Sequence, residues 1–386
     1  MKLAKIGAAL ALSVGIAGLS VYAPACSSGG GNADGGPTGD LAKPPAPTGD
    51  NTTVTDEVTF AVDSLQLGEA PRAGGPASTN AWKEYGYDID GLKSDKNSTD
   101  VCTPAAGGGS QVKVDGNNGI DNSFGANILP IIQSAASLPE PSKTITEAIR
   151  DGSFTLQLKI KGLDTAKAAT QTNQGLSSQL FASGKFDETG ATKPTFSPND
   201  DWPVRPELLN DGMTIASGSK VSFPKSYIVN GTFVNGSPGK VTISLVFSGV
   251  ALDLEIQQAI ISMQMKDGDS AVNGTISGVL DTEKLIDGLR KVAGRISTSL
   301  CGGSTFDGIA QQIRQTSDIL ADGTNKAGVP CNAISVGLGF TAKRIKNPTK
   351  VAPLGPPSPD PCMAMPDGGA DSGKTDSGVS DAAGGG

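Results

Sequence analysis

Two loop-like stretches carry most of the side chains that could do chemistry in this chain. They span residues 87–91 and 114–123 and are rich in Asp, Asn and Gly. In the second stretch Asp115, Asn117 and Asp121 occupy positions 1, 3 and 7, a spacing by which a tight loop aims side-chain oxygens at one point. Calcium takes about six to eight oxygen ligands from carboxylates, amides and main chain. The sequence predicts a calcium site with ligands from this set: Asp88, Asp90, Asp115, Asn117, Asp121 and Asn122.

The second stretch resembles the Asp/Asn-rich calcium loops of the EF-hand and its shorter relatives. Gly119 stands at position 5, where the EF-hand has an oxygen ligand, and Ala126 stands at position 12, where it has Glu. The alternative interpretation is turn chemistry alone, because Asn-Gly and Asp-Gly pairs form turns without a metal. Both interpretations stay open at the level of sequence.

Nucleophilic catalysis has few routes in this chain, because it contains no histidine. That excludes Ser-His and Cys-His pairs and His-ligated metals. A serine nucleophile would need a lysine base, and two Ser-x-x-Lys strings occur, at residues 217–220 and 222–225. Neither lies at a recognisable helix start, so neither indicates an active site.

Carboxylate pairs are the remaining candidates for hydrolysis, since two carboxyl groups can cleave a glycosidic bond. Asp200 and Asp201 precede Trp202, whose ring could stack on a sugar. Asp253 and Glu255 share one face of an expected strand. The plainer interpretation is an acidic loop and a solvated strand face. An exported hydrolase acting on carbohydrate or peptidoglycan is kept as an alternative function.

The first 25 residues have the pattern of an export signal peptide. A lysine-bearing start leads into an apolar run over residues 6–21, too short for a stable spanning helix. The segment Ala23-Pro24-Ala25-Cys26 resembles a bacterial lipobox, with Ala23 where the family usually has Leu. The resemblance implies a lipid on Cys26, and thus a membrane partner and outer-membrane or cell-surface anchoring. The alternative is a secreted or periplasmic protein.

Five cysteines agree with this interpretation, because an odd number in an exported protein needs an explanation. With Cys26 carrying lipid, four remain for two disulfides in an oxidising compartment. Three pairings can be drawn, and we favour Cys301–Cys331 with Cys102–Cys362.

Composition divides the rest of the chain. Residues 26–51 form a Gly/Pro-rich tether, and residues 349–386 form a Pro-rich strap with a Gly/Asp/Ser tail. Neither can bury an apolar core, so we expect the tether and the tail to be disordered. This layout resembles uncharacterised surface lipoproteins of myxobacteria, a resemblance that brings no known activity. Residues 52–348 are expected to form one β-rich domain.

Apolar residues alternate with polar ones over residues 58–62, 154–161, 241–247, 252–256 and 334–340, which predicts strands. In the first of these segments the alternation slips at Asp63-Ser64. Helical spacing appears over 285–296, after a capping Asp281, and over 309–320, after a Ser304/Asp307 capping box. Shorter apolar segments at 128–138 and 144–149 complete the helices. We predict an α+β fold: a β-rich antiparallel meander or sandwich-like body with a few packed amphipathic helices.

The net charge of −8 argues against a nucleic-acid partner, because phosphate binding needs a basic surface. The sequence favours a non-enzymatic, lipid-anchored cell-envelope protein that acts as a structural or binding module. Besides the hydrolase, a lipid carrier remains as an alternative, since an aliphatic sheet packed by amphipathic helices could enclose an apolar cavity.

Overall fold

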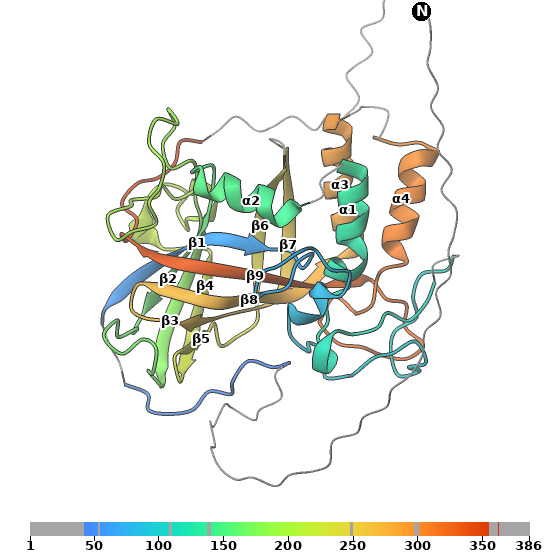
Figure 1. Ribbon diagram of the computed structural model, residues 1–386, viewed down its shortest axis with the longest axis horizontal. Helices are drawn as coiled ribbons and strands as arrows, with labels where there is room; N and C mark the ends of the chain where they lie inside the picture. Colours follow the sequence, from blue (N-terminus) through green and yellow to red (C-terminus); the bar gives the residue numbers. More distant parts are fainter. Residues whose placement is uncertain are drawn as a thin grey trace, which may run out of the picture. The chain divides into compact units, whose positions relative to one another are not determined.

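Nine antiparallel strands form the body of the protein (Figure 1). The computed structural model describes residues 42–52, 55–107, 110–136, 140–247, 250–296, 301–354 and Cys362. The predicted signal peptide, Cys26, most of the tether and the tail lie outside the described residues. The strands are β1 (Glu57–Gln66), β2 (Leu156–Lys161), β3 (Asn173–Ala182), β4 (Val221–Val229), β5 (Thr232–Val234), β6 (Gly239–Phe247), β7 (Val250–Met265), β8 (Ser270–Asp281) and β9 (Ala333–Ile345).

The sheet closes on itself. Its strand order is β5-β4-β3-β2-β1-β9-β8-β7-β6, and β5 also pairs with the second half of β7. Eight strands therefore form a closed barrel, while β6 pairs with the first half of β7. The β-rich α+β prediction is compatible with this structure, but the barrel is more specific than the meander or sandwich we expected. Closure depends on one short contact between distant strands, which no local alternation of residues encodes.

Among the described residues, four α-helices accompany the barrel: α1 (Leu129–Ala136), α2 (Pro141–Arg150), α3 (Thr282–Ile296) and α4 (Ser304–Arg314). The predicted cap of α3 is confirmed, because the Lys284 N–H donates to the Asp281 carboxylate at 3.0 Å. The predicted capping box of α4 is wrong: Gly303 stands at the N-cap, and no side chain caps the helix. Helix α2 packs on β1 and β6, and α3 packs on β7 and β8 (Figure 1). No helix within the described residues is long and apolar enough to cross a membrane.

Strand alternation separates the barrel interior from its outer face. Phe60 and Val62 of β1 belong to the main buried cluster, whereas Ala61 packs with Trp202 on the opposite side. The expected slip of β1 is confirmed as a register shift between Val62 and Ser64. A second irregularity lies in β7, where Gln258 has a φ of 52° and the pairing with β8 shifts.

The outer face of β8 and β9 carries the long segment between β1 and α1. Gly337 of β9 has the backbone of Tyr85 so close that an added Cβ would lie 2.2 Å from the Tyr85 carbonyl oxygen. The Tyr87 N–H donates to the Ser277 hydroxyl of β8 at 3.0 Å. These contacts require a missing or small side chain at the outward positions of both strands. They fix the first of the two Asp-rich loops on the barrel wall.

The cysteines pair as Cys102–Cys331 and Cys301–Cys362. The predicted pairing of Cys301 with Cys331 and of Cys102 with Cys362 is therefore wrong. Cys331 lies beside the segment that contains Cys102, because the Cys331 N–H donates to the Thr103 carbonyl at 2.9 Å. Two disulfides indicate folding in an oxidising, exported environment.

Both flanks of the domain lie against the body. Ala42 is fully buried, and its carbonyl accepts the Asp88 N–H at 2.8 Å. Further on, the Tyr227 hydroxyl donates to the Pro45 carbonyl. At the other end, the Ala352 N–H donates to the Val204 carbonyl. We call residues 42–52 the N-terminal strap. Although their composition suits a tether, they form part of the folded domain.

Candidate metal site

Backbone bonds hold the two Asp-rich loops side by side. The Asp121 N–H donates to the Tyr87 carbonyl at 3.0 Å, so the second loop runs along the first. Gly119, with a φ of +84°, allows the approach, because a Cβ there would lie 2.8 Å from the Leu92 carbonyl oxygen. Gly119 thus has a packing role in the position where a calcium loop of the EF-hand type has an oxygen ligand.

Three carboxylates from these loops converge. One oxygen each of Asp88, Asp90 and Asp121 lies within 4.8 Å of the others. Two oxygens on opposite sides of a Ca²⁺ ion lie about 5 Å apart, because Ca–O distances are about 2.3–2.6 Å. The spacing is therefore suited to Ca²⁺, although the hydrogen bonds show that the same carboxylates also brace the loops. Asp121 accepts the Ile89 N–H at 2.6 Å, and Asp88 accepts the Gly91 N–H at 2.7 Å.

Two further carboxylates, Asp115 and Asp318, lie within electrostatic reach. Burial, with repulsion from Asp90 and Asp88, raises the pKa of Asp115 to about 7. Burial, with repulsion from Asp115 and Asp90, also raises the pKa of Asp318 to about 7 despite its hydrogen bonds from Ser335. Burial raises the pKa of Asp121 well above its usual value, with repulsion from Asp90, Asp318 and Asp115 as further causes. We call these five residues the carboxylate cluster: Asp88, Asp90, Asp115, Asp121 and Asp318.

Two lysines approach the cluster. The Lys43 ammonium of the N-terminal strap lies 3.4 Å from the Asp88 carboxylate, and its side chain is about half exposed, at 53%. Burial lowers the pKa of Lys113, and the neighbouring Asp318 opposes that shift. The carboxylates of the cluster outnumber these ammonium groups, which leaves an excess of negative charge in a partly buried place. Protons or a divalent cation can neutralise that excess.

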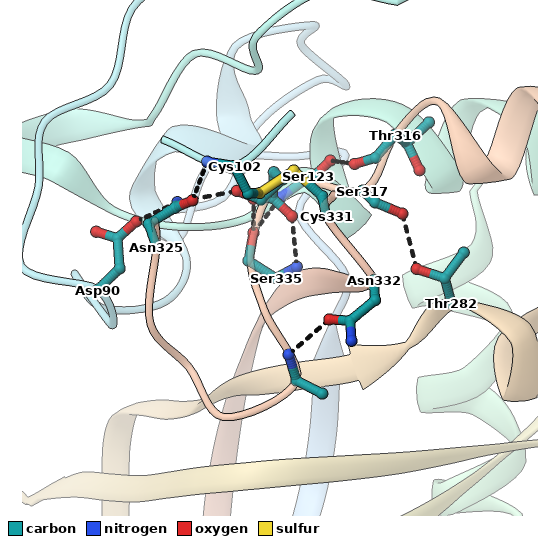
Figure 2. The surroundings of a disulfide bond; sticks show 12 residues. Asp90, Cys102, Ser123, Thr282, Thr316, Ser317, Asn325, Cys331, Asn332 and Ser335 are labelled. Carbon is teal, nitrogen blue, oxygen red and sulfur yellow. Dashed lines mark hydrogen bonds between the residues drawn. A yellow bond between two sulfur atoms is a disulfide. The ribbon is translucent and has the colours of Figure 1, made fainter. Parts of the chain in front are cut away.

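Asn325 connects the cluster to a disulfide, as Figure 2 shows. Its amide nitrogen donates to the Asp90 carboxylate at 2.7 Å and to the Asp318 carbonyl at 3.0 Å. Its amide oxygen accepts the Cys102 N–H at 2.7 Å, beside the Cys102–Cys331 bond. Ser335 of β9 donates both its N–H and its hydroxyl to Asp318. The disulfide and the barrel wall therefore hold one side of the cluster.

Not all of the six predicted ligands come together. Asn117 is exposed. Asn122 is buried, and its amide is engaged in the fold: its nitrogen donates to the Trp82 carbonyl, and its oxygen accepts the N–H groups of Gly125 and Gly337. The 1-3-5-7 spacing within one loop does not make the site. The converging oxygens belong to two loops, and Asp318, which sequence reasoning missed, comes from a third segment.

The residues proposed for hydrolysis have other partners. Trp202 is fully buried, with ring centroids of Phe186 and Phe196 at 5.0 and 5.8 Å, so it cannot stack on a sugar. Asp200 accepts N–H groups of the 195–196 turn. Asp201 accepts the N–H and hydroxyl of Thr349.

The second proposed pair is occupied as well. Asp253 accepts the Ser244 hydroxyl, and Glu255 forms ion pairs with Lys240 at 2.7 Å and Lys284 at 2.6 Å. Every carboxylate raised as a hydrolytic candidate therefore binds a neighbouring strand, helix or loop.

In comparisons with known proteins, no protein family, curated protein or solved structure matches the chain.

Proposed function

We propose that this protein is a non-enzymatic, lipid-anchored envelope module whose loops are ordered by Ca²⁺. The observation that carries the proposal is the carboxylate cluster, in which three oxygens lie within 4.8 Å of one another and two more carboxylates have raised pKa values. A folded domain keeps such repulsion when a bound cation relieves it. The two disulfides and the lipobox-like start support a place outside the cytoplasm, where Ca²⁺ is abundant.

Calcium binding can be measured directly by isothermal titration of a Cys26→Ser form freed of metal. We expect one Ca²⁺ to bind with a Kd of about 10⁻⁴ M, the tight end of the range of extracellular modules. Asp90→Asn should weaken binding at least tenfold, since it removes a ligand charge. Asp253→Asn is the matched control, because Asp253 lies on β7 and bonds to Ser244. Absence of heat with Ca²⁺, or equal affinity in Asp90→Asn, would contradict the proposal.

The anchor requires a separate experiment. Cells that express the wild-type chain and a Cys26→Ser variant are labelled with a palmitate analogue. We expect label on the wild type and none on the variant, with the wild type in the membrane fraction. An unlabelled wild type would show a secreted or periplasmic protein and would leave the calcium site to be judged by titration.

The two alternatives have less support. A hydrolase would need free carboxylates beside a sugar-stacking ring, whereas Asp200 and Asp201 brace loops and Trp202 is buried. A lipid carrier would need interior space, whereas the inward-facing apolar side chains of the strands pack together in the main buried cluster.

A further inference from the structure

The pairing of β3 with β4 is interrupted twice within a few residues. Its register shifts between Asn173 and Leu176 and again between Leu176 and Ser178, opposite a stretch of β4 that contains Pro224. Bulges bend a strand and disrupt the ladder, and proline donates no hydrogen bond. A surface groove of about 610 Å³ lies at this interruption, which we call the β3–β4 groove. It is far from the carboxylate cluster in sequence and shares no residue with it.

The N-terminal strap forms one wall of the β3–β4 groove. Pro47 and Asn51 line it, and the Gln174 amide fixes the strap by donating to the Gly49 carbonyl at 2.9 Å. A second hollow of about 370 Å³ shares Lys161 and Ser177 with the first. Together the two hollows form an extended, solvent-open track along the outer face of β2 and β3. Small-molecule sites are usually enclosed, whereas an open track is suited to a polymer.

The charge of the groove is opposite to that of the protein. The chain has a net charge of −8, yet the lining of the first hollow contains Lys161 and Lys225 and no carboxylate. Both lysines are exposed, and among the described residues neither forms an ion pair. In the second hollow Glu57 is neutralised by Lys159 at 2.5 Å. The lining of the two hollows therefore contains three lysines and one glutamate, an excess of positive charge.

The other lining groups are suited to sugars. Asn51, Gln174 and Ser177 present amides and a hydroxyl, which can exchange hydrogen bonds with sugar hydroxyls. Pro47 and Pro224, both exposed, supply apolar surface for the C–H faces of a pyranose. Ammonium groups at two points of the groove can pair with carboxylates that recur along a chain. We propose that the β3–β4 groove binds an acidic polysaccharide, a polymer of uronate-type sugars.

The proposal can be tested by affinity electrophoresis of the full chain as a Cys26→Ser form. The probe is polygalacturonate, with neutral dextran and poly-L-glutamate as comparison polymers. EDTA is present throughout, because uronates bind Ca²⁺ themselves, and this keeps the result independent of the calcium proposal. We expect polygalacturonate alone to retard the protein, and the retardation to decrease as salt rises from about 0.15 M to 0.5 M.

The decisive variant is Lys161→Glu with Lys225→Glu, which should weaken binding at least tenfold. Lys291→Glu with Lys326→Glu is the matched control: both lysines are exposed, lie outside the groove and bring the same charge change. It should keep the wild-type affinity within about twofold. Thermal melts verify that both variants fold. The proposal is overturned if wild type is not retarded, if the groove variant binds like wild type, or if poly-L-glutamate binds equally well.

Discussion

The carboxylate cluster and the long loop between β3 and β4, residues 183–220, are both rich in Asp, yet three carboxyl groups of the cluster have raised pKa values and three of the loop have lowered ones. In the cluster, burial raises the pKa of Asp115 and of Asp318 to about 7. In the loop, hydrogen bonds from Thr189 and Thr192 lower the pKa of the exposed Asp187 to about 2. Hydrogen bonds from Thr214 and Met213 likewise lower the pKa of Asp211.

The difference lies in what surrounds each carboxylate. In the β3–β4 loop Asp187 and Asp211 each accept hydrogen bonds from N–H groups and threonine hydroxyls a few residues away, so their charges are satisfied locally. In the cluster the carboxylates face one another across three segments. The first arrangement stabilises a loop as it stands, whereas the second is stable only when something neutralises it. An Asp-rich sequence alone does not distinguish the two.

The largest effect is expected from the disulfide beside the cluster. Cys102→Ser with Cys331→Ser opens a link that spans 229 residues, so unfolding should become easier by about 2–5 kcal/mol. Because Asn325 joins Cys102 to Asp90, Ca²⁺ affinity should decrease as well. Denaturant melts and calcium titration measure the two effects.

The second disulfide is the control for that experiment. The Cys301–Cys362 bond spans 61 residues. By the chain-entropy estimate, its removal in Cys301→Ser with Cys362→Ser should cost about 1 kcal/mol less stability than removal of the first disulfide. This second variant should bind Ca²⁺ with the affinity of the wild type. Equal loss of calcium binding in both variants would show that the cluster depends on general stability and not on the Asn325 link.

Substitution of a carboxylate inside the cluster should stabilise the metal-free protein, whereas most substitutions destabilise a fold. Both hydrogen bonds to Asp121 end at one oxygen, which Asn can retain. In chelator at pH 8, Asp121→Asn should therefore raise the Tm, by at least about 2 °C, because it removes a buried acidic group from a cluster of carboxylates that repel one another. With Ca²⁺ present the same variant should lose most of the metal-dependent stabilisation. A lower Tm in chelator would mean that the Asp121 charge is already balanced within the fold.

The pH dependence of the metal-free protein should follow the raised pKa values. The folded cluster binds protons up to about pH 7, whereas an unfolded Asp releases them near pH 4. Stability from this source is complete below about pH 4 and is lost as the pH rises through 7. Melts in chelator should therefore show a falling Tm between pH 5 and 8, and Ca²⁺ should reduce the fall by displacing the protons.

The β3–β4 loop should contribute the opposite dependence of stability on pH. The lowered pKa of Asp187 contributes stability above about pH 4 that is lost as the pH falls towards 2. A Tm that stays flat from pH 5 to 8 in chelator would contradict the raised pKa values of the cluster.

The smallest effect is expected from Asp201→Asn. Although partial burial opposes the shift, hydrogen bonds from Thr349 and Lys346 lower the pKa of Asp201. Weakening these bonds should lower the Tm by about 1–2 °C, as a loss of about 0.5 kcal/mol would. Its sign is opposite to that of Asp121→Asn in chelator, and calcium binding should be unchanged. A raised Tm in Asp201→Asn would remove the contrast between the two regions.

Much of the fold follows from local pattern. Alternation located most strands, and the slip at Asp63-Ser64 located a bulge, because a period-2 pattern records which face each residue takes. Barrel closure and the cysteine pairing were missed, since both depend on contacts between segments far apart in the chain. Asp318 was missed for the same reason: Asn325, which joins it to Asp90, lies 235 residues from that aspartate. The two Asp-rich loops were found because each is dense in ligand-type residues.

The most direct test of the account is a thermal melt of the Cys26→Ser protein at pH 8, in chelator and then in about 10 mM Ca²⁺. A ligand at about 100 times its Kd adds about 2.7 kcal/mol, which corresponds to a rise of about 5–10 °C in a domain of this size. The account predicts that rise in the wild type and in Asp201→Asn, and its near absence in Asp121→Asn. An unchanged Tm in the wild type, or an equal rise in Asp121→Asn, would contradict it.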